Sequence, residues 1–203
     1  MDYLALIPAR SGSKGIVNKN IQDLNGFPMV AYTFYAAINS KLINSVHLSS
    51  NDKDVIKIAK KYNIEVPFVR PESLSSDKST TLDVVLHFLN WFKKENKFLP
   101  KNFILLQPTS PLRDSDDIDN AINKFEKNKT LSLFSACEVS QHPFEMFHID
   151  SNNSLEFFYQ KANSVKIKTR QHYRNVYFED GAIYICNTKW FLKNKVFYNN
   201  SSS

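Results

Sequence analysis

Short apolar runs alternate with amphipathic stretches along most of this chain, and this alternation restricts the fold more than any other feature. The first run, Tyr3–Pro8, is apolar throughout, which is typical of a parallel strand buried on both faces. Further strands are predicted at residues 45–50, 65–69, 103–107, 131–138 and 181–186, and helices at 28–40, after Asn51 or Asp52, and at 80–96, 115–128 and 190–193. Such alternation predicts an α/β fold: a doubly wound, mostly parallel sheet with helices on both faces.

Single residues indicate where several of these helices begin. Pro28 is acceptable in a first turn and is predicted to open the first helix, with Gly26 turning the chain into it. Thr80 or Thr81 is predicted to cap the helix that ends at Asn96, and Ser115 the helix that ends near Asn128.

The pattern breaks between residues 139 and 178, where a His-Pro pair, an Asn-Asn pair and alternating segments replace it. This break predicts an inserted β-hairpin or small subdomain. No linker or internal repeat is present, so residues 1–203 are predicted to form a single domain that contains this insertion.

The chain is basic, with a formal net charge of +6 and an isoelectric point near 9.2. Its lysines are scattered and no aromatic stacking motif stands out, so we expect a small anionic ligand and no nucleic acid. No apolar run reaches the roughly 18 residues of a membrane span, so no membrane partner is expected. Cys137 and Cys186 lie far apart in apolar runs, which predicts buried free thiols of a cytoplasmic protein.

A polar loop at residues 9–20 directly follows the first predicted strand. It contains the cations Arg10, Lys14 and Lys19, the glycines Gly12 and Gly15, and the hydroxyl residues Ser11 and Ser13. Glycines allow backbone N–H groups to turn toward a phosphate, and the cations can neutralise a triphosphate. The loop matches neither a Walker A loop nor a GxGxxG motif. It predicts a nucleotide site without specifying the nucleotide, and a basic surface loop is the alternative.

Two more polar segments follow predicted strands. Residues 107–113 read Gln-Pro-Thr-Ser-Pro-Leu-Arg, in which the prolines stiffen a turn and uncharged side chains suit a polyhydroxy ligand. Arg113 would bind a carboxylate or cap this turn. In residues 70–81, Arg70 is the candidate for ligand binding. Because ligands of such sheets bind at the carboxyl ends of strands, these segments are expected to share one site.

Taken together, the stretches IPARSGSKG, NKN, VPFVRPESLSSD, LLQPTSPLR and DGAIYI resemble the acylneuraminate cytidylyltransferases, the CMP-sialic acid synthetases. The resemblance covers about residues 4–190, and LLQPTSPLR is its most specific element. It implies a Rossmann-like nucleotidyltransferase fold, in which the insertion at 139–178 is a dimerisation element of a homodimer.

The resemblance also implies a reaction: CTP and an acidic nine-carbon sugar give the CMP-sugar and pyrophosphate, with Mg²⁺ on the departing pyrophosphate. Its implied site residues are Arg10, Lys14 and Lys19 at the triphosphate, in a catalytic role; Asn20 and Arg70 on the nucleotide side, with Ser11, Gly12 and Ser13 of the loop; and Gln107, Thr109, Ser110, Arg170 and Gln171 on the sugar side.

Three departures from the family pattern leave the metal ligands unknown. The family's C-terminal Asp-x-Asp pair, which binds magnesium, is absent before Ser203. Asp180 stands where Asn is usual, and Thr169 where Pro is usual. Glu179 and Asp180 could compensate as metal ligands, or they could form a solvated acidic turn. An alternative to the enzyme is therefore a nucleotide-binding but catalytically impaired homologue, and a basic nucleic-acid-binding domain is the third hypothesis.

Overall fold

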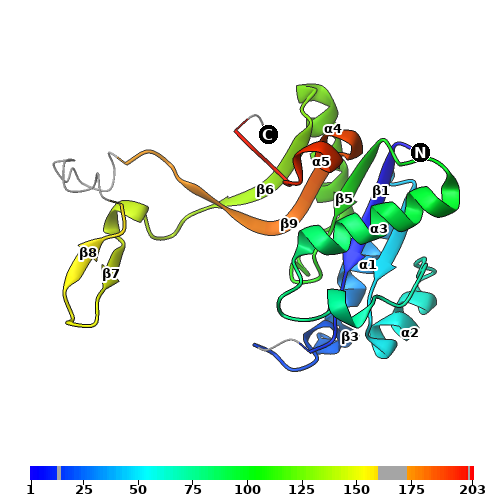
Figure 1. Ribbon diagram of the computed structural model, residues 1–203, viewed down its shortest axis with the longest axis horizontal. Coiled ribbons are helices and arrows are strands. Elements are labelled where there is room, and N and C mark those ends of the chain that lie inside the picture. Colours follow the sequence, from blue (N-terminus) through cyan, green and yellow to red (C-terminus); the bar gives the residue numbers. More distant parts are fainter. Residues whose placement is uncertain (13–14, 160–172, 201) are drawn as a thin grey trace. The chain divides into compact units, whose positions relative to one another are not determined.

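The computed structural model describes residues 1–12, 15–159, 173–200 and 202–203 (Figure 1). The chain divides into two compact units, residues 1–135 with 181–203, and residues 136–180. Lys14 and Ser13 of the first loop, and Arg170 and Gln171 of the insertion, lie outside the described residues.

The first unit is built on a mixed, mostly parallel sheet. Within the described residues its strand order is β4-β1-β5-β9-β6. The strands are β1 (Tyr3–Pro8), β4 (Ser45–Ser49), β5 (Asn102–Leu105), β6 (Ser132–Glu138) and β9 (Tyr177–Asn187). β1 pairs in parallel with β4 and β5, whereas β9 runs antiparallel to β5. The central position of β1 explains its unbroken apolar sequence, because both of its faces are covered.

Helices cover both faces of this sheet, which confirms the predicted doubly wound α/β fold (Figure 1). Helices α1 (Met29–Asn39), α2 (Lys53–Lys61) and α4 (Ser115–Asn128) pack on the face that carries Ala5 and Ile7. Helices α3 (Thr81–Asn96) and α5 (Thr188–Asn194) pack on the face that carries Leu4 and Leu6. The alternation of side chains along β1 thus supplies both halves of the core.

Side-chain oxygens cap the beginnings of α2, α3 and α4. Thr80 caps α3 in a capping box with Asp83, as predicted, and Asp52 caps α2. The prediction of Ser115 as the cap of α4 was wrong. Asp114 takes that role: its backbone is extended and its Oδ1 accepts the amide of Asp117 at 2.8 Å, while Ser115 is already helical.

A continuous strand at residues 65–69 was also predicted wrongly. The chain makes only two isolated parallel bridges here, His47 with Glu65 and Ser50 with Val69. Pro67 lies between them, and because proline has no amide hydrogen it cannot donate to a ladder. The segment therefore runs beside β4 without joining the sheet as a regular strand.

A short hairpin that was not predicted from the sequence precedes α1. Strands β2 (Asp23–Leu24) and β3 (Phe27–Pro28) are antiparallel and are joined by Asn25 and Gly26, whose φ angles are 51° and 88°. Two positive φ angles are what an Asn-Gly hairpin turn requires. Gly26 therefore closes this hairpin and does not lead directly into the helix, which begins at Met29 with Pro28 as its N-cap.

The cysteines are both free, but only one is buried. Cys186 lies in the core, where burial raises the pKa of its thiol. Cys137 is only partly buried, against the prediction, because β6 passes out of the buried part of the sheet before reaching it. Among the described residues, no helix has the length and apolarity needed to cross a membrane.

The second unit contains the predicted inserted hairpin. Strands β7 (Phe147–Ile149) and β8 (Leu155–Phe157) pair antiparallel, with Ile149 opposite Leu155. Three short 3₁₀ segments complete the described elements: Lys19–Ile21 and Glu72–Leu74 in the first unit and Pro143–Glu145 in the second.

Candidate functional site

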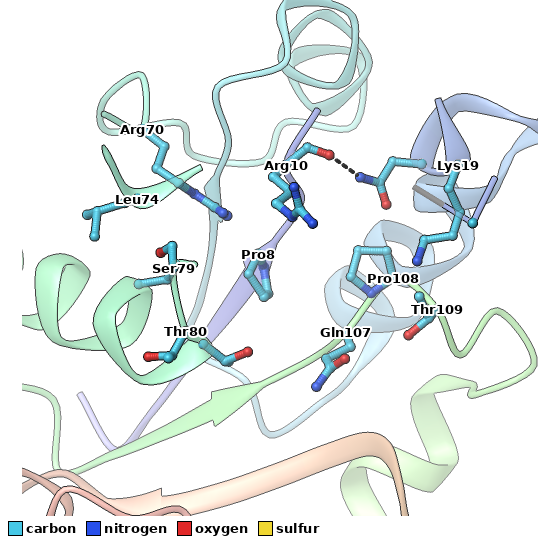
Figure 2. A pocket seen from close by; sticks show the side chains of 14 residues that line it. Pro8, Arg10, Lys19, Arg70, Leu74, Ser79, Thr80, Gln107, Pro108 and Thr109 are labelled. Carbon is cyan, nitrogen blue, oxygen red and sulfur yellow. Dashed lines mark hydrogen bonds between the residues drawn. The ribbon is translucent and has the colours of Figure 1, made fainter. Parts of the chain in front are cut away.

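A pocket of about 260 Å³ opens in the first unit, where the chain leaves the carboxyl ends of β1 and β5 (Figure 2). Its lining comes from three segments that are distant in sequence: Pro8, Arg10, Gly15, Lys19 and Asn20; Arg70, Leu74, Ser79, Thr80, Thr81 and Val84; and Gln107, Pro108 and Thr109. The segments predicted from strand ends therefore share one pocket, as expected for a sheet of this class.

Arg10 is held at the pocket by contacts on both sides. Its Nη1 donates to the carbonyl oxygens of Gly12 at 3.4 Å and Ser75 at 3.3 Å, and its Nη2 donates to Asp77 Oδ1 at 2.8 Å. The side-chain amide of Asn20 donates to the Arg10 carbonyl at 2.9 Å, the contact drawn in Figure 2. Asn20 thus fixes the backbone of Arg10, and the guanidinium remains a third exposed.

Arg70 lies deeper and is anchored to the end of β4. Its Nε donates to Ser49 Oγ at 3.0 Å, its Nη2 donates to the Ser49 carbonyl, and its backbone amide donates to the Ser50 carbonyl at 2.8 Å. Burial, together with the nearby charge of Arg10, lowers the pKa of Arg70 to about 10. Burial and the Arg70 charge also lower the pKa of His87 on α3.

The residues that line the pocket carry a net positive charge, although Asp77, which is not among them, pairs with Arg10. Arg10, Lys19 and Arg70 line it, and among its described lining residues there is no carboxylate. Two guanidinium groups that repel one another in a partly buried site are stabilised by a polyanion, because the anion removes the repulsion and replaces lost water contacts. The arrangement is suited to binding several phosphate groups.

The opposite wall carries uncharged polar groups. Gln107 and Thr109 line the pocket on either side of the buried Pro108 (Figure 2). An amide and a hydroxyl can each donate and accept hydrogen bonds, which suits a polyhydroxy ligand. Arg113 takes the second of its two predicted roles and caps this turn: its side chain is buried, and its Nη1 donates to the Gln107 carbonyl at 3.2 Å.

Six of the predicted residues line the pocket: Arg10, Lys19, Asn20, Arg70, Gln107 and Thr109. Ser11, Gly12 and Ser110 follow lining residues in the sequence but do not themselves line the pocket. The Ser11 amide donates to Asn51 Oδ1 at 3.0 Å, and the Ser110 carbonyl accepts the Arg113 amide at 3.3 Å. The residues Ser13, Lys14, Arg170 and Gln171 lie outside the described part of the chain, so their predicted roles stay predictions.

Of residues 70–81, only Arg70 was predicted from the sequence to bind a ligand, but the beginning of α3 also lines the pocket. Ser79, Thr80, Thr81 and Val84 line the pocket, so Thr80 serves it as well as capping the helix. The signal was available, since this helix starts directly after the segment that follows a predicted strand. Glu179 and Asp180 are exposed and lie on β9, so the suggested acidic turn is part of a strand. Among the described residues, no three His, Cys, Asp or Glu side chains cluster as a metal site.

The sequence of this chain matches one known family along most of its length. The family model described as cytidylyltransferase matches residues 4–198. The chain is 33% identical over 204 residues to the pseudaminic acid cytidylyltransferase of Campylobacter jejuni, covering all of this chain and 86% of that protein. This chain belongs to the cytidylyltransferase family. The match confirms the resemblance drawn from the sequence.

Two other relatives extend the range of sugars named for this cytidylyltransferase family. The CMP-N,N'-diacetyllegionaminic acid synthase of Legionella pneumophila is 33% identical over 98% of this chain and 83% of its own length. The N-acylneuraminate cytidylyltransferase of Escherichia coli O18:K1:H7 is 33% identical over 96% of this chain, which spans 44% of that protein.

Solved structures share the fold of this cytidylyltransferase. A CMP:2-keto-3-deoxy-manno-octonic acid synthetase complexed with CTP superposes with a TM-score of 0.68 at 15% identity, covering 95% of this chain and 77% of the other. A 4-diphosphocytidyl-2C-methyl-D-erythritol synthase from Anaerococcus prevotii gives 0.65 at 16% identity, over 96% and 74%. At these identities the likeness concerns the fold.

Proposed function

We propose that this cytidylyltransferase transfers the CMP group of CTP to the anomeric hydroxyl of a nonulosonic acid and releases pyrophosphate. The observation that carries the proposal is the composition of the pocket, in which Arg10, Lys19 and Arg70 line the same cavity as Gln107 and Thr109. A triphosphate matches the cations, and a polyhydroxy acid matches the uncharged wall. The names of the relatives support both substrates.

The proposed reaction needs positioning and charge neutralisation more than a protein nucleophile. The anomeric oxygen forms a bond to the α-phosphorus, the bond from that phosphorus to the bridging oxygen breaks, and the hydroxyl proton passes to solvent. Arg10, Lys19 and Arg70 would lower the cost of the charge that collects on the departing pyrophosphate. Gln107 and Thr109 would hold the sugar in line for the attack.

We propose that Mg²⁺ accompanies CTP. The described residues supply no cluster of three or more metal-ligating side chains, so they do not by themselves fit a dedicated magnesium site. Magnesium commonly binds through substrate phosphates and retained waters with few protein ligands, and when bound it would neutralise phosphate charge. The steps proposed for this chain rest on its own cations.

We also propose that the protein works as a homodimer, with a second copy docking on the hairpin of the second unit. Ile149 and Leu155 face one another across β7 and β8, and each is 67% exposed. A two-stranded hairpin is marginally stable alone, and apolar side chains on its surface favour a partner. Since reducing compartments keep thiols free, the two unpaired cysteines are consistent with a cytoplasmic site for the reaction.

The decisive experiment measures pyrophosphate release from CTP and Mg²⁺ with pseudaminic, N,N'-diacetyllegionaminic or N-acetylneuraminic acid. We expect release that requires both substrates, with one sugar preferred. Arg10→Ala and Gln107→Ala are each expected to reduce turnover by roughly 100-fold, since each removes a group that contacts the reacting substrates. Lys57→Ala, at an exposed lysine on α2, is the matched control and should retain full activity.

The outcomes separate the hypotheses. Saturable CTP binding without turnover of any of the three sugars would favour the catalytically impaired homologue. Binding of oligonucleotides without preference for CTP would favour the nucleic-acid hypothesis. Full turnover by Arg10→Ala or Gln107→Ala would remove that residue from the site.

A further inference from the structure

Arg113 is a buried cation that the proposed reaction does not use directly. It stands six residues after Gln107, at the end of the turn that leads from β5 toward α4, and it is 6% exposed. Its Nη1 donates to the Gln107 carbonyl at 3.2 Å and to the Ala182 carbonyl at 2.7 Å, and its Nη2 donates to Thr33 Oγ1 at 2.8 Å. One guanidinium therefore joins the turn after β5, the strand β9 and the helix α1.

Next to the two carbonyls that share Nη1, the side chain of Gln107, which lines the pocket, packs against Gly181. Gly181 directly precedes Ala182, and a Cβ atom built on Gly181 would lie 3.7 Å from both Nε2 and Oε1 of Gln107. The Gln107 amide therefore packs over the Cα of Gly181. Gly181 has φ +77°, a conformation that side chains other than glycine rarely adopt. The position of the amide thus depends on the backbone spacing at this point.

Arginine suits this task for a geometric reason. The two N–H bonds of Nη1 lie in the rigid plane of the guanidinium, so the two carbonyl oxygens that share this nitrogen are held in fixed directions. A lysine ammonium would carry the same charge on a flexible stem without that rigid plane. A buried apolar side chain would fill the space but would leave two carbonyl oxygens without this donor.

We propose that Arg113 is a positioning residue for the acceptor side of the pocket. It fixes the distance between the Gln107 and Ala182 backbones, and it thereby sets the direction in which the Gln107 amide meets the sugar. The proposal deepens the proposed function and rests on it for the identity of the ligand. The placement of the Gln107 amide by Arg113 can be tested without any substrate.

The kinetic test compares Arg113→Lys with Thr33→Val. The lysine variant should raise KM for the acceptor sugar about tenfold, the effect of misplacing one hydrogen-bonding group, while the affinity for CTP measured without sugar changes by less than about twofold. Thr33→Val removes only the contact to α1 and should leave the sugar KM unchanged. Equal changes in sugar KM and CTP affinity would show a merely structural role and overturn the proposal.

A double-mutant cycle tests whether Arg113 acts through Gln107. In a Gln107→Ala background, Arg113→Lys should have little further effect on sugar KM, because the group that it positions is already absent. Additive effects would contradict the proposal.

A spectroscopic readout separates this proposal from the proposed function. The side-chain amide signal of Gln107 in a ¹⁵N NMR spectrum, identified by its loss in Gln107→Ala, should shift in Arg113→Lys and stay in place in Thr33→Val. If Arg113→Lys does not fold, Gly181→Ala changes the contact between Gly181 and the Gln107 amide, and it should also shift that signal. An unshifted signal in folded Arg113→Lys or Gly181→Ala overturns the proposal, whether or not any sugar is a substrate.

Discussion

The imidazole of His47 is enclosed between the sheet and α3. It is 3% exposed, its ring centroid lies 5.3 Å from that of Phe88 and 6.0 Å from that of Phe92, and its Nδ1 lies 3.2 Å from Glu65 Oε2. Burial lowers the pKa of His47 below its ordinary 6.5, and the Glu65 carboxylate only partly opposes this effect. The folded state therefore binds protons less readily at this site than the unfolded chain does.

This difference predicts a loss of stability in acid. The contribution of His47 is fully present above pH 6.5 and is lost as the pH falls toward the lower pKa of the folded state, because the unfolded chain takes up the proton first. The free energy of unfolding, measured by urea denaturation from about pH 7.5 to 5, should fall less steeply in His47→Gln than in the unsubstituted protein. His148→Gln, at an exposed histidine, is the control and should keep the original slope. Identical slopes in the His47 variant would refute the assignment.

Residues near strand ends could be predicted from the sequence, and buried partners could not. Arg10 and Arg70 were identified because polar residues after buried strands gather at one edge of a sheet. Arg113 has the same type of context, yet its side chain points inward. Its partner Ala182 lies 69 residues further along the chain, so no local pattern marks the arginine as buried.

The capping box of α4 gives a prediction at the scale of the element. Asp114 Oδ1 accepts the Asp117 amide at 2.8 Å, and Asp117 Oδ2 accepts the Asp114 amide at 3.1 Å. Asp114→Ala should lower the free energy of unfolding by about 1 kcal/mol, the usual cost of removing an N-cap. Ser115→Ala is the paired control and should change it by less than about 0.5 kcal/mol, as for most surface substitutions. If Ser115→Ala lowers the free energy of unfolding more than Asp114→Ala does in the same denaturation series, Ser115 is the N-cap, as predicted from the sequence.

Helices were predicted better than the short segments between them. The periodicity of α3 and α4 spans several turns, so it fixes both elements to within a residue or two. Residues 65–69 have the apolar composition of a strand, but a single Pro67 decides their hydrogen bonding. The Asn25-Gly26 hairpin is the opposite case. Its turn signal was present in the sequence, but Gly26 was interpreted only as a turn into the first helix.

The proposed dimer gives a prediction for the whole molecule. Ile149→Lys combined with Leu155→Lys should place two like charges opposite each other on the exposed hairpin and convert a dimer to a monomer in analytical ultracentrifugation. CTP affinity should stay within about twofold, since the described pocket lies entirely in the first unit. Lys57→Ala, in the first unit, serves as the control. If the doubly substituted protein is still a dimer, the interface does not lie on this hairpin.

The class of the fold could be predicted from the alternating pattern, but its strand order could not. β9 enters between β5 and β6 and runs antiparallel to β5, although it follows both in sequence. Apolar composition alone carries no information on direction or neighbour, because a strand buried on both faces looks the same in either orientation.

That strand order also sets a sequence of events during synthesis. β6 leaves the ribosome before the second unit, but its neighbour in the sheet is β9, which emerges only afterwards. Until then, the edges of β5 and β6 remain open to unwanted pairing. The intervening segment must bring its ends together before the sheet is complete, and doubling the length of such a loop costs only about 0.6 kcal/mol. Changes in the length of the second unit should therefore alter the time that these edges stay exposed far more than the stability of the finished sheet.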